Sequence, residues 1–233
     1  MMKQFFGISL ASMALAAASQ AAVVVTSSNQ TGPGTGLFTP TFTPSSTDLI
    51  NGLSPSTSSG DFMLEASDGT PALTNGVYPP LSTGTVGSHA GLATAGNGNG
   101  SGTQVTYLFS SSNIDRVNIY GGWNDAGRDE QNFSIQFSSD GGTTFGAAIL
   151  SGSFNPIFTD VAPRPQTATL VSISDNAGPL ATGVNAIRVN FLAVENGHTG
   201  YAEIDVIAVP EPGSFAMLGL ATVGLAARRR RRA

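Results

Sequence analysis

A run of polar and charged residues surrounds the single tryptophan of the chain. Trp123 is followed by Asn124 and Asp125, and Arg128 comes shortly after. An exposed aromatic ring in a loop beside such groups suits a neutral sugar, because the ring takes the apolar face and the polar groups take the hydroxyls. The same residues also fit a structural role, in which Trp123 packs over one end of a domain and Arg128 pairs with Asp125 or Asp129.

Two more residues are candidates for contact with a ligand. His198 and Tyr201 lie in the segment Glu195–Tyr201 that leads into the last predicted strand. Both side chains can hydrogen-bond a polar ligand, and both are equally typical of residues at the rim of a domain.

Acidic residues near Trp123 raise the alternative of a glycan-acting hydrolase. Asp125, Asp129 and Glu130 are close enough in sequence to supply a pair of carboxyl groups. The chain has only two histidines, His89 and His198, and it contains no nucleophile elbow, zinc-protease motif or phosphate-binding loop. A non-catalytic protein is therefore the stronger prediction.

The charge distribution excludes several classes of partner. Between the two ends, four arginines stand against fourteen acidic residues, and the chain has no cysteine. Nucleic-acid binding is not expected, because phosphate contacts need lysine and arginine. Disulfides and cysteine-ligated metals are also excluded, whereas divalent cations and neutral sugars remain compatible.

Alternation of apolar and polar residues predicts short antiparallel strands. The apolar positions are Val105, Tyr107, Phe109, Val117, Ile119, Phe133, Ile135, Phe137, Ala168, Leu170, Ile187, Val189, Phe191, Ile204 and Val206. Turns are expected at Gly121-Gly122, Asp140-Gly141-Gly142 and Asn196-Gly197. Without an amphipathic helix, this pattern predicts an all-β, antiparallel jelly-roll β-sandwich.

The N-terminus is typical of a secretory signal peptide. Lys3 precedes the apolar run Phe5–Ala18, and Ser19-Gln20-Ala21 places small residues before a cut after Ala21. The sequence thus predicts a helical signal peptide over residues 1–21, removed by signal peptidase.

The C-terminus combines a rigid segment, an apolar segment and a basic cluster. Val209-Pro210-Glu211-Pro212 precedes the apolar stretch Gly213–Ala227, which predicts a short transmembrane helix. The chain then closes on an arginine run that includes Arg228, Arg229 and Arg230. By the positive-inside rule, this run holds the end of the chain on the cytoplasmic side.

These C-terminal residues resemble the PEP-CTERM sorting signal of Gram-negative-type bacteria. The resemblance implies recognition of Pro210, Glu211 and Pro212 by an exosortase, a membrane protease, while the precursor is transiently anchored in the inner membrane. It further implies that the mature protein passes to the cell surface or the extracellular matrix.

The body resembles galactose-binding-like, or discoidin-like, domains. The resemblance rests on Ile119–Phe133, Phe137–Gly142 and Glu195–Val206, and it covers residues 49–208. It implies an eight-stranded jelly roll and carbohydrate as the ligand.

The same resemblance implies a structural Ca²⁺ near the chain ends, held by Asn75 and Glu203. Glu203 and Asp205 are two residues apart and therefore lie on one face of the last strand. Oxygen ligands of this kind suit calcium. A hydrogen-bonded or solvated carboxylate pair is the alternative.

The expected organisation is a signal peptide (1–21), a Ser/Thr/Gly-rich lead-in (22–48), the β-sandwich (49–208) and the sorting tail (209–233). The lead-in is either poorly ordered or an early edge strand. We expect an exported, non-catalytic protein of the cell surface or biofilm matrix that binds polysaccharide. A structural matrix protein without a specific ligand is the main alternative.

Overall fold

The computed structural model describes residues 22–82, 89–96, 103–124, 127–155, 165–192, 195 and 197–210. The predicted signal peptide, with Ala21, lies outside these residues. So do Glu211, Pro212 and the remainder of the tail with Arg228, Arg229 and Arg230. Within the described ranges, no helix is long and apolar enough to cross a membrane.

The described chain is built from β-strands, as the sequence predicts. The strands are β1 (Val23–Thr31), β2 (Leu37–Phe38), β3 (Thr57–Ser59), β4 (Leu81–Ser82), β5 (Ala93–Ala95), β6 (Thr103–Trp123), β7 (Phe133–Ser138), β8 (Ile149–Leu150), β9 (Thr167–Asp175), β10 (Ala181–Phe191) and β11 (Thr199–Ala208). Two short 3-10 segments, η1 (Leu64–Ala66) and η2 (Thr70–Thr74), lie between β3 and β4.

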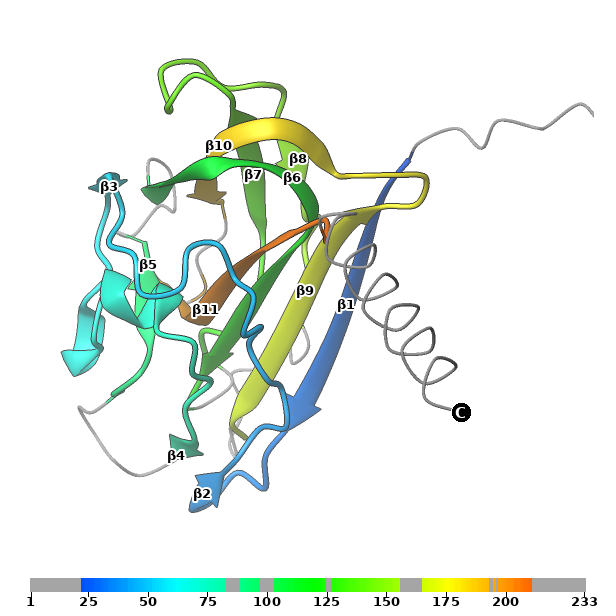
Figure 1. Ribbon diagram of the computed structural model, residues 1–233. Helices are drawn as coiled ribbons and strands as arrows, with labels where there is room; N and C mark the ends of the chain where they lie inside the picture. Colours follow the sequence, from blue (N-terminus) through cyan, green and yellow to red (C-terminus); the bar gives the residue numbers. More distant parts are fainter. Residues whose placement is uncertain are drawn as a thin grey trace, which may run out of the picture.

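A single long strand organises the sheet. The first part of β6 pairs with β10 and β3, and its second part pairs with β9 and β11. All strand pairings are antiparallel, and the nine-stranded sheet curls where β6 bends (Figure 1). The two regions of apolar alternation around Val105 and Val117, expected as separate strands, are therefore two parts of β6. This curled antiparallel sheet is consistent with a β-sandwich.

The hydrophobic core lies between the two parts of the curled sheet. It contains Tyr107, Val117 and Ile119 of β6, together with apolar residues of β7, β9, β10 and β11. Ile187, Val189, Ile204 and Val206 are fully buried, which confirms their predicted inward orientation.

A second apolar layer covers the opposite face of β9, β6 and β11. Leu81, Leu92, Tyr120, Trp123, Ala168 and Ala202 form this layer, and Phe38, Phe42, Tyr78 and Leu170 pack against it. The covering residues come from the segments around β2 and β4 and from Leu92 just before β5. Both faces of these strands are consequently buried.

The lead-in segment contributes an edge strand. β1 pairs with β9 along its whole length, from Val23 opposite Asp175 to Thr31 opposite Thr167. Among the described strands β1 has no second neighbour, and its first residues, Val23, Val24 and Val25, are exposed. The early-edge-strand interpretation of this segment thus matches the structure.

Two sequence predictions near Trp123 are wrong. Gly121 and Gly122 lie inside β6 and make no turn, and Trp123 is the last residue of that strand. A Cβ at Gly122 would lie 2.2 Å from the Tyr78 hydroxyl oxygen, so glycine is needed for close packing. By contrast, Gly141 and Gly142 have positive φ angles of 73° and 81° after β7, as the predicted turn requires.

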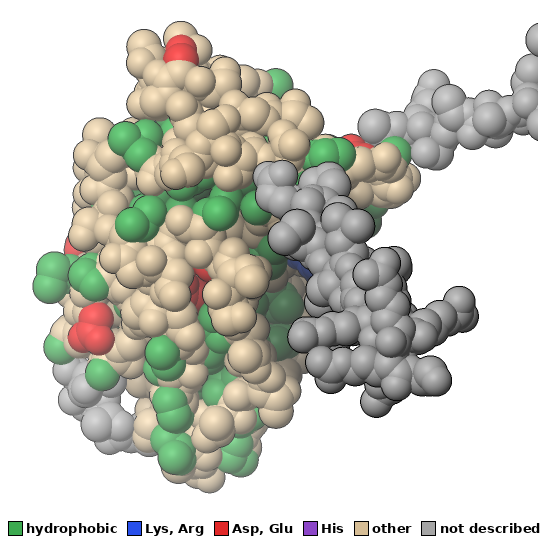
Figure 2. All heavy atoms as spheres, viewed as in Figure 1, with side chains coloured by type: hydrophobic (Ala, Val, Ile, Leu, Met, Phe, Trp, Pro, Cys, Tyr) green, Lys and Arg blue, Asp and Glu red, His purple; other side chains and the backbone are tan. Residues whose placement is uncertain are grey.

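Charged side chains are sparse on the surface. Figure 2 shows a face on which uncharged groups predominate and acidic side chains stand apart from one another. This agrees with a chain in which only 11% of residues are charged.

Candidate functional site

The indole of Trp123 is buried and offers no open platform to a ligand. Only 1% of the residue is exposed, and it belongs to the second apolar layer. A Cβ on Gly200, in the adjacent β11, would lie 2.6 Å from the indole Cε3 atom. The packed interpretation of Trp123 therefore describes the structure, because the segment before β5 covers the ring.

His89 covers the Trp123 ring directly. The two ring centroids are 3.9 Å apart and the planes differ by 13°, which is a stacked arrangement. His89 is held in place by an isolated parallel bridge to Ser67, just after η1. The bridge brings the segment around η1 over the end of β6, although the two are far apart in sequence.

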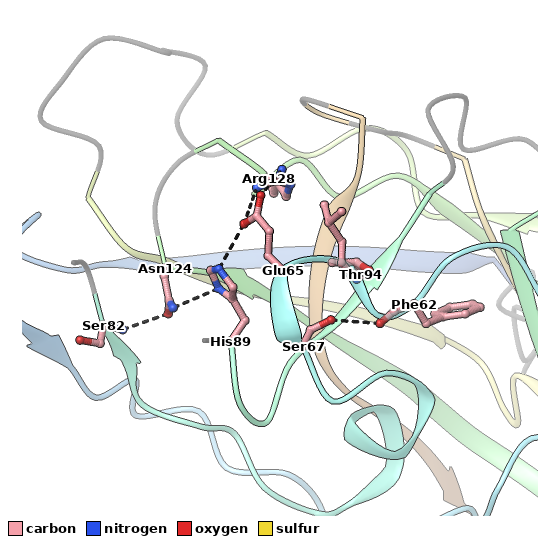
Figure 3. Close-up of polar contacts among 9 residues, drawn as sticks. Phe62, Glu65, Ser67, Ser82, His89, Thr94, Asn124 and Arg128 are labelled. Carbon is pink, nitrogen blue, oxygen red and sulfur yellow. Dashed lines mark hydrogen bonds and ion pairs between the residues drawn. The ribbon is translucent and has the colours of Figure 1, made fainter. Parts of the chain in front are cut away.

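Glu65 links this stack to Arg128. Its carboxylate lies 3.2 Å from His89 Nε2 and accepts hydrogen bonds of 3.0 and 3.3 Å from the two terminal nitrogens of Arg128 (Figure 3). Glu65 and Ala66 have φ angles of 53° and 57°, which L-residues rarely adopt. This strained backbone turns the Glu65 carboxylate toward both partners, while the side chain stays 42% exposed.

Arg128 also contacts the Trp123 ring. Its guanidinium carbon lies 5.4 Å from the ring centroid, within the range of a cation–π contact. Its carbonyl oxygen accepts a hydrogen bond from the Gly200 N–H. Arg128 thus pairs with Glu65 and not with Asp129, one of the two partners considered from the sequence.

Asn124 closes the network at the end of β6. Its side-chain nitrogen lies 3.0 Å from His89 Nδ1, and its oxygen accepts the backbone N–H of Ser82 (Figure 3). We call Glu65, His89, Asn124 and Arg128 the Glu65 cluster. Asp125, which the sequence also nominated, lies outside the described residues.

Asp129 occupies a buried position beside this cluster. Glu195 accepts the backbone N–H groups of Asp129 and Glu130 at 2.8 and 3.1 Å. Neither side-chain oxygen of Asp129 has a hydrogen-bond partner in the described part of the chain. Burial, followed by the nearby Glu195 carboxylate, raises the pKa of Asp129 to about 8.

The other two ligand candidates lie apart from the Glu65 cluster. His198 Nε2 is 3.3 Å from a carboxylate oxygen of Asp61. Tyr201 is fully buried in the main core and contacts Phe191, with 4.5 Å between the ring centroids. Tyr201 therefore cannot reach a surface ligand in this conformation.

The predicted metal ligands Asn75 and Glu203 differ in their surroundings. Asn75 is exposed, and its side-chain oxygen accepts the N–H of Val77 at 2.8 Å. Glu203 is fully buried on β11 and accepts the N–H of Gly76 at 2.9 Å. Burial, with the negative charges of Asp205 and Asp48, raises the pKa of Glu203 to about 8.

Two members of the Glu65 cluster were not nominated as site residues from the sequence. His89 stood out only as one of two histidines, and nothing in the local pattern singled out Glu65. The only hint in the sequence was the residue type of His89, a titratable side chain in a stretch otherwise made of glycine, small apolar and hydroxyl-bearing residues.

Val209 and Pro210 follow β11. The Val209 N–H donates to the Asn113 carbonyl oxygen, and Pro210 follows as an exposed residue outside any strand. Comparison with known families matches residues 208–232 to the PEP-CTERM protein-sorting motif. The chain carries a PEP-CTERM sorting signal. The motif indicates an exported protein that is sorted to the cell surface.

The solved structures to which the chain is similar include two carbohydrate-binding-module structures, both with a low TM-score. The first is CBM32 of AlyQ in complex with 4,5-unsaturated mannuronic acid, at 16% identity and TM-score 0.31, covering 51% of this chain and 78% of that one. The second contains the CBM32-1, CBM32-2 and catalytic domains of Clostridium perfringens ZmpB, at 21% identity and TM-score 0.29. It covers 50% of this chain and 12% of that one. Neither similarity is close enough to assign a ligand, and no curated protein matches the chain.

Proposed function

We propose that this protein is an exported, non-catalytic surface or matrix protein that an exosortase-type protease processes at the PEP-CTERM tail. In this proposal the β-rich body is a jelly-roll β-sandwich that binds carbohydrate at the Glu65 cluster. In this proposal, signal peptidase cuts the precursor, and only the precursor is anchored in the inner membrane.

The binding proposal rests on the position of Glu65. Its carboxylate contacts His89 and Arg128, which both lie against Trp123 at the end of β6. A carboxylate, a guanidinium and an amide converge there. These groups are hydrogen-bond donors and acceptors of the kinds that bind sugar hydroxyls. The strained φ of Glu65 supports a functional role, since such backbone conformations concentrate at ligand sites.

The tryptophan has an indirect role in this proposal. Its ring fixes His89 by stacking and Arg128 by a cation–π contact. Of the side chains of Glu65, His89 and Arg128, that of Glu65 is the most exposed. A sugar would therefore meet the Glu65 carboxylate first and the edges of His89 and Arg128 next.

A glycan array probed with the full chain tests the binding proposal. Glu65→Gln keeps the shape of the side chain and removes its charge, and it should weaken binding to any positive glycan at least tenfold. Glu130→Gln is the matched control, because Glu130 contacts Ser153 outside the cluster. Equal binding by wild type and Glu65→Gln would place the sugar elsewhere, and release of sugar products lost on Asp129→Asn would instead favour a hydrolase.

The sorting part is tested separately by cell fractionation. Deletion of residues 210–233 should leave a released product where the full chain reaches the cell surface. A deletion variant that still reaches the same surface location would contradict processing at this tail.

A specific observation supports the second candidate, a structural matrix protein without a sugar ligand. The edge strand β1 has three consecutive exposed valines and no second neighbour among the described strands. Exposed edge strands of this kind pair readily with other chains. This candidate predicts self-association that Val24→Lys abolishes, together with a blank glycan array.

A further inference from the structure

Strand β10 carries an arginine on the outer face of the sheet. Ile187 and Val189 are fully buried in the core, so Arg188 between them points to the opposite side. The register of the strands places Arg188 beside Thr106 of β6 and Gln136 of β7. Arg188 therefore lies in the middle of a surface formed by three strands.

No carboxylate neutralises Arg188 in the part of the chain that the structure describes. Its Nε lies 3.5 Å from Thr106 Oγ1, at the outer limit of a hydrogen bond, and its two terminal nitrogens have no partner among the described residues. By contrast, Arg116 and Arg128 each pair with an acidic residue. A guanidinium stays charged in proteins, so the terminal N–H groups of Arg188 are donors that a ligand can use.

Phe145 orders the guanidinium of Arg188. The guanidinium carbon lies 3.8 Å from the centroid of the Phe145 ring, which is a close cation–π contact. Phe145 belongs to the segment between β7 and β8, and this segment is tied to the sheet beside it. The Gly146 N–H donates to the Phe137 carbonyl oxygen, and Gln136 Nε2 donates to the Gly146 carbonyl oxygen at 3.0 Å. A side chain ordered in advance loses less entropy when a ligand binds.

Two amide side chains lie on the same outer face. Asn190 is two residues beyond Arg188, and its Nδ2 donates at 3.3 Å to both Ser134 Oγ and Gln136 Oε1. Gln104 lies opposite Asn190 on β6, is partly exposed, and makes no side-chain hydrogen bond to a described residue. The Asn190 oxygen and the Gln104 amide thus supply further acceptors and donors on the surface that carries Arg188.

Asp140, the acidic residue that follows β7, is engaged by its own turn. Its Oδ1 accepts the Ser138 hydroxyl at 2.7 Å and the N–H groups of Thr143 and Thr144 at 3.1 and 2.9 Å. Its Oδ2 accepts the Thr144 hydroxyl at 2.7 Å. Both oxygens are therefore satisfied within the turn, and Asp140 forms no ion pair with Arg188 or any other described residue.

The chemistry of these groups selects the kind of ligand. A guanidinium with unused terminal donors suits a planar carboxylate, which it binds through two parallel hydrogen bonds. Side-chain amides suit hydroxyl groups. One carboxylate together with several hydroxyls is the composition of a uronic acid. A nucleic acid is not expected, because its closely spaced phosphates need several basic residues and this face has one.

We propose that Arg188, Asn190 and Gln104 form a second carbohydrate site, which binds the uronic acid units of an acidic polysaccharide. The Arg188 guanidinium binds the sugar carboxylate, and the two amides bind its hydroxyls. The site lies on the outer face of β10 and is distinct from the Glu65 cluster at the end of β6. The exposed Glu65 carboxylate would repel an acidic sugar, so the two sites differ in the charge of the sugar that they take.

Calorimetric titration of the full chain, purified in detergent, tests the proposal. The probes are trimers of galacturonate and of glucuronate, the neutral galactose and glucose trimers, and a sulfated galactose trimer. We expect at least one uronate trimer to bind at least about tenfold more tightly than its neutral counterpart, because a hydrogen bond to a charged group is worth more than a neutral one. The sulfated trimer offers an oxyanion without the planar carboxylate and should bind more weakly.

Variants of the site separate a sugar contact from a structural role. Arg188→Lys keeps the positive charge but loses the planar donor pair, and it should weaken uronate binding at least about tenfold. Gln104→Glu keeps the shape of a side chain that makes no hydrogen bond to a described residue, so we expect it to fold normally. Its added negative charge should weaken uronate binding and leave the Tm unchanged. Arg116→Gln is the control, since Arg116 is exposed and pairs with Asp115 elsewhere on β6.

A Glu65→Gln variant distinguishes failure of this site from failure of the Glu65 cluster. It should retain full uronate affinity even where it loses binding to neutral glycans. Loss of uronate binding in Glu65→Gln would place the acidic sugar at the Glu65 cluster and overturn the proposal.

Three other results would also overturn it. One is the absence of uronate binding at about 10 mM sugar, where even a Kd of about 1 mM gives nearly full occupancy. Another is uronate binding that both Arg188→Lys and Gln104→Glu retain. The third is equal affinity for the sulfated and carboxylated trimers, which would mean that the face does not select a carboxylate.

Discussion

The imidazole of His89 lies parallel to the indole of Trp123, with 3.9 Å between the ring centroids. This stack joins the Glu65 cluster to the second apolar layer, because His89 belongs to the cluster and Trp123 to the layer. His89 therefore has two roles, because it shields the indole from water on one side and contacts the Glu65 carboxylate at its edge.

Removal of the imidazole should expose the tryptophan. His89→Ala should move the emission maximum of Trp123, the only tryptophan, to longer wavelength and lower the free energy of unfolding by at least about 1 kcal/mol. Fluorescence and denaturant unfolding measure the two effects. His198→Ala should leave the emission unchanged, since His198 contacts Asp61 and not the indole. An unchanged emission in His89→Ala would contradict the stacked arrangement.

Close packing of β11 against Trp123 requires glycine at position 200. In Gly200→Ala the new methyl group would approach the Gly122 carbonyl oxygen and the indole, so we expect a loss of about 1–3 kcal/mol. Thermal denaturation measures the loss. Gly178→Ala is the matched control, because nothing lies within 4 Å of a Cβ at that position. Equal melting temperatures for the two variants would mean that the strands are less tightly packed than the structure indicates.

The strained backbone beside Glu65 makes an unusual substitution stabilising. Ala66 has a φ of 57°, a conformation that costs an L-residue about 1–2 kcal/mol and glycine almost nothing. After subtraction of the extra chain entropy of glycine, Ala66→Gly should stabilise the fold by about 0.5 kcal/mol. Ala66→Val should destabilise it, since β-branched residues tolerate positive φ poorly. If calorimetry finds a higher Tm for Ala66→Val than for Ala66→Gly, residue 66 does not have the strained conformation.

Stability should fall as the pH rises, in part because of Asp129. Its pKa is about 8 in the folded protein, whereas the ordinary pKa of an aspartate side chain is 3.8. Between these values the folded state keeps a proton that the unfolded state has lost, so the free energy of unfolding decreases with increasing pH. Asp129→Asn should flatten the dependence of Tm on pH from about 4 to 8. A variant with the same slope as wild type would show that Asp129 does not titrate in this window.

The strand pattern was the part of the fold that the sequence predicted best. Ile187, Val189 and Ile204 point inward because apolar and polar residues alternate along β10 and β11. The continuity of β6 could not be predicted, since Gly121 and Gly122 read as a turn. Glycines that permit close packing and glycines that permit a turn look alike in one sequence.

The candidate site was only partly accessible to sequence reasoning. Arg128 and Asn124, nominated from the sequence as ligand-binding residues, lie beside Trp123, and of the two interpretations of the indole the packed one matches the structure. Glu65 reaches the cluster through a positive φ, and no glycine or asparagine marks that conformation in the sequence. Asp48 meets Glu203 and Asp205 only through a pairing between distant segments, which local patterns do not specify.

Sugar titration monitored by Trp123 emission tests the proposed binding site most directly. The indole contacts both His89 and Arg128, so a ligand that binds their edges must alter its emission. We predict a saturable change for glycans that score on the array, and a loss of at least tenfold in affinity for Arg128→Lys, which cannot form the bidentate contact with Glu65. Saturable glycan binding that leaves the emission unchanged and is equally tight in Arg128→Lys would contradict the Glu65 cluster as the site.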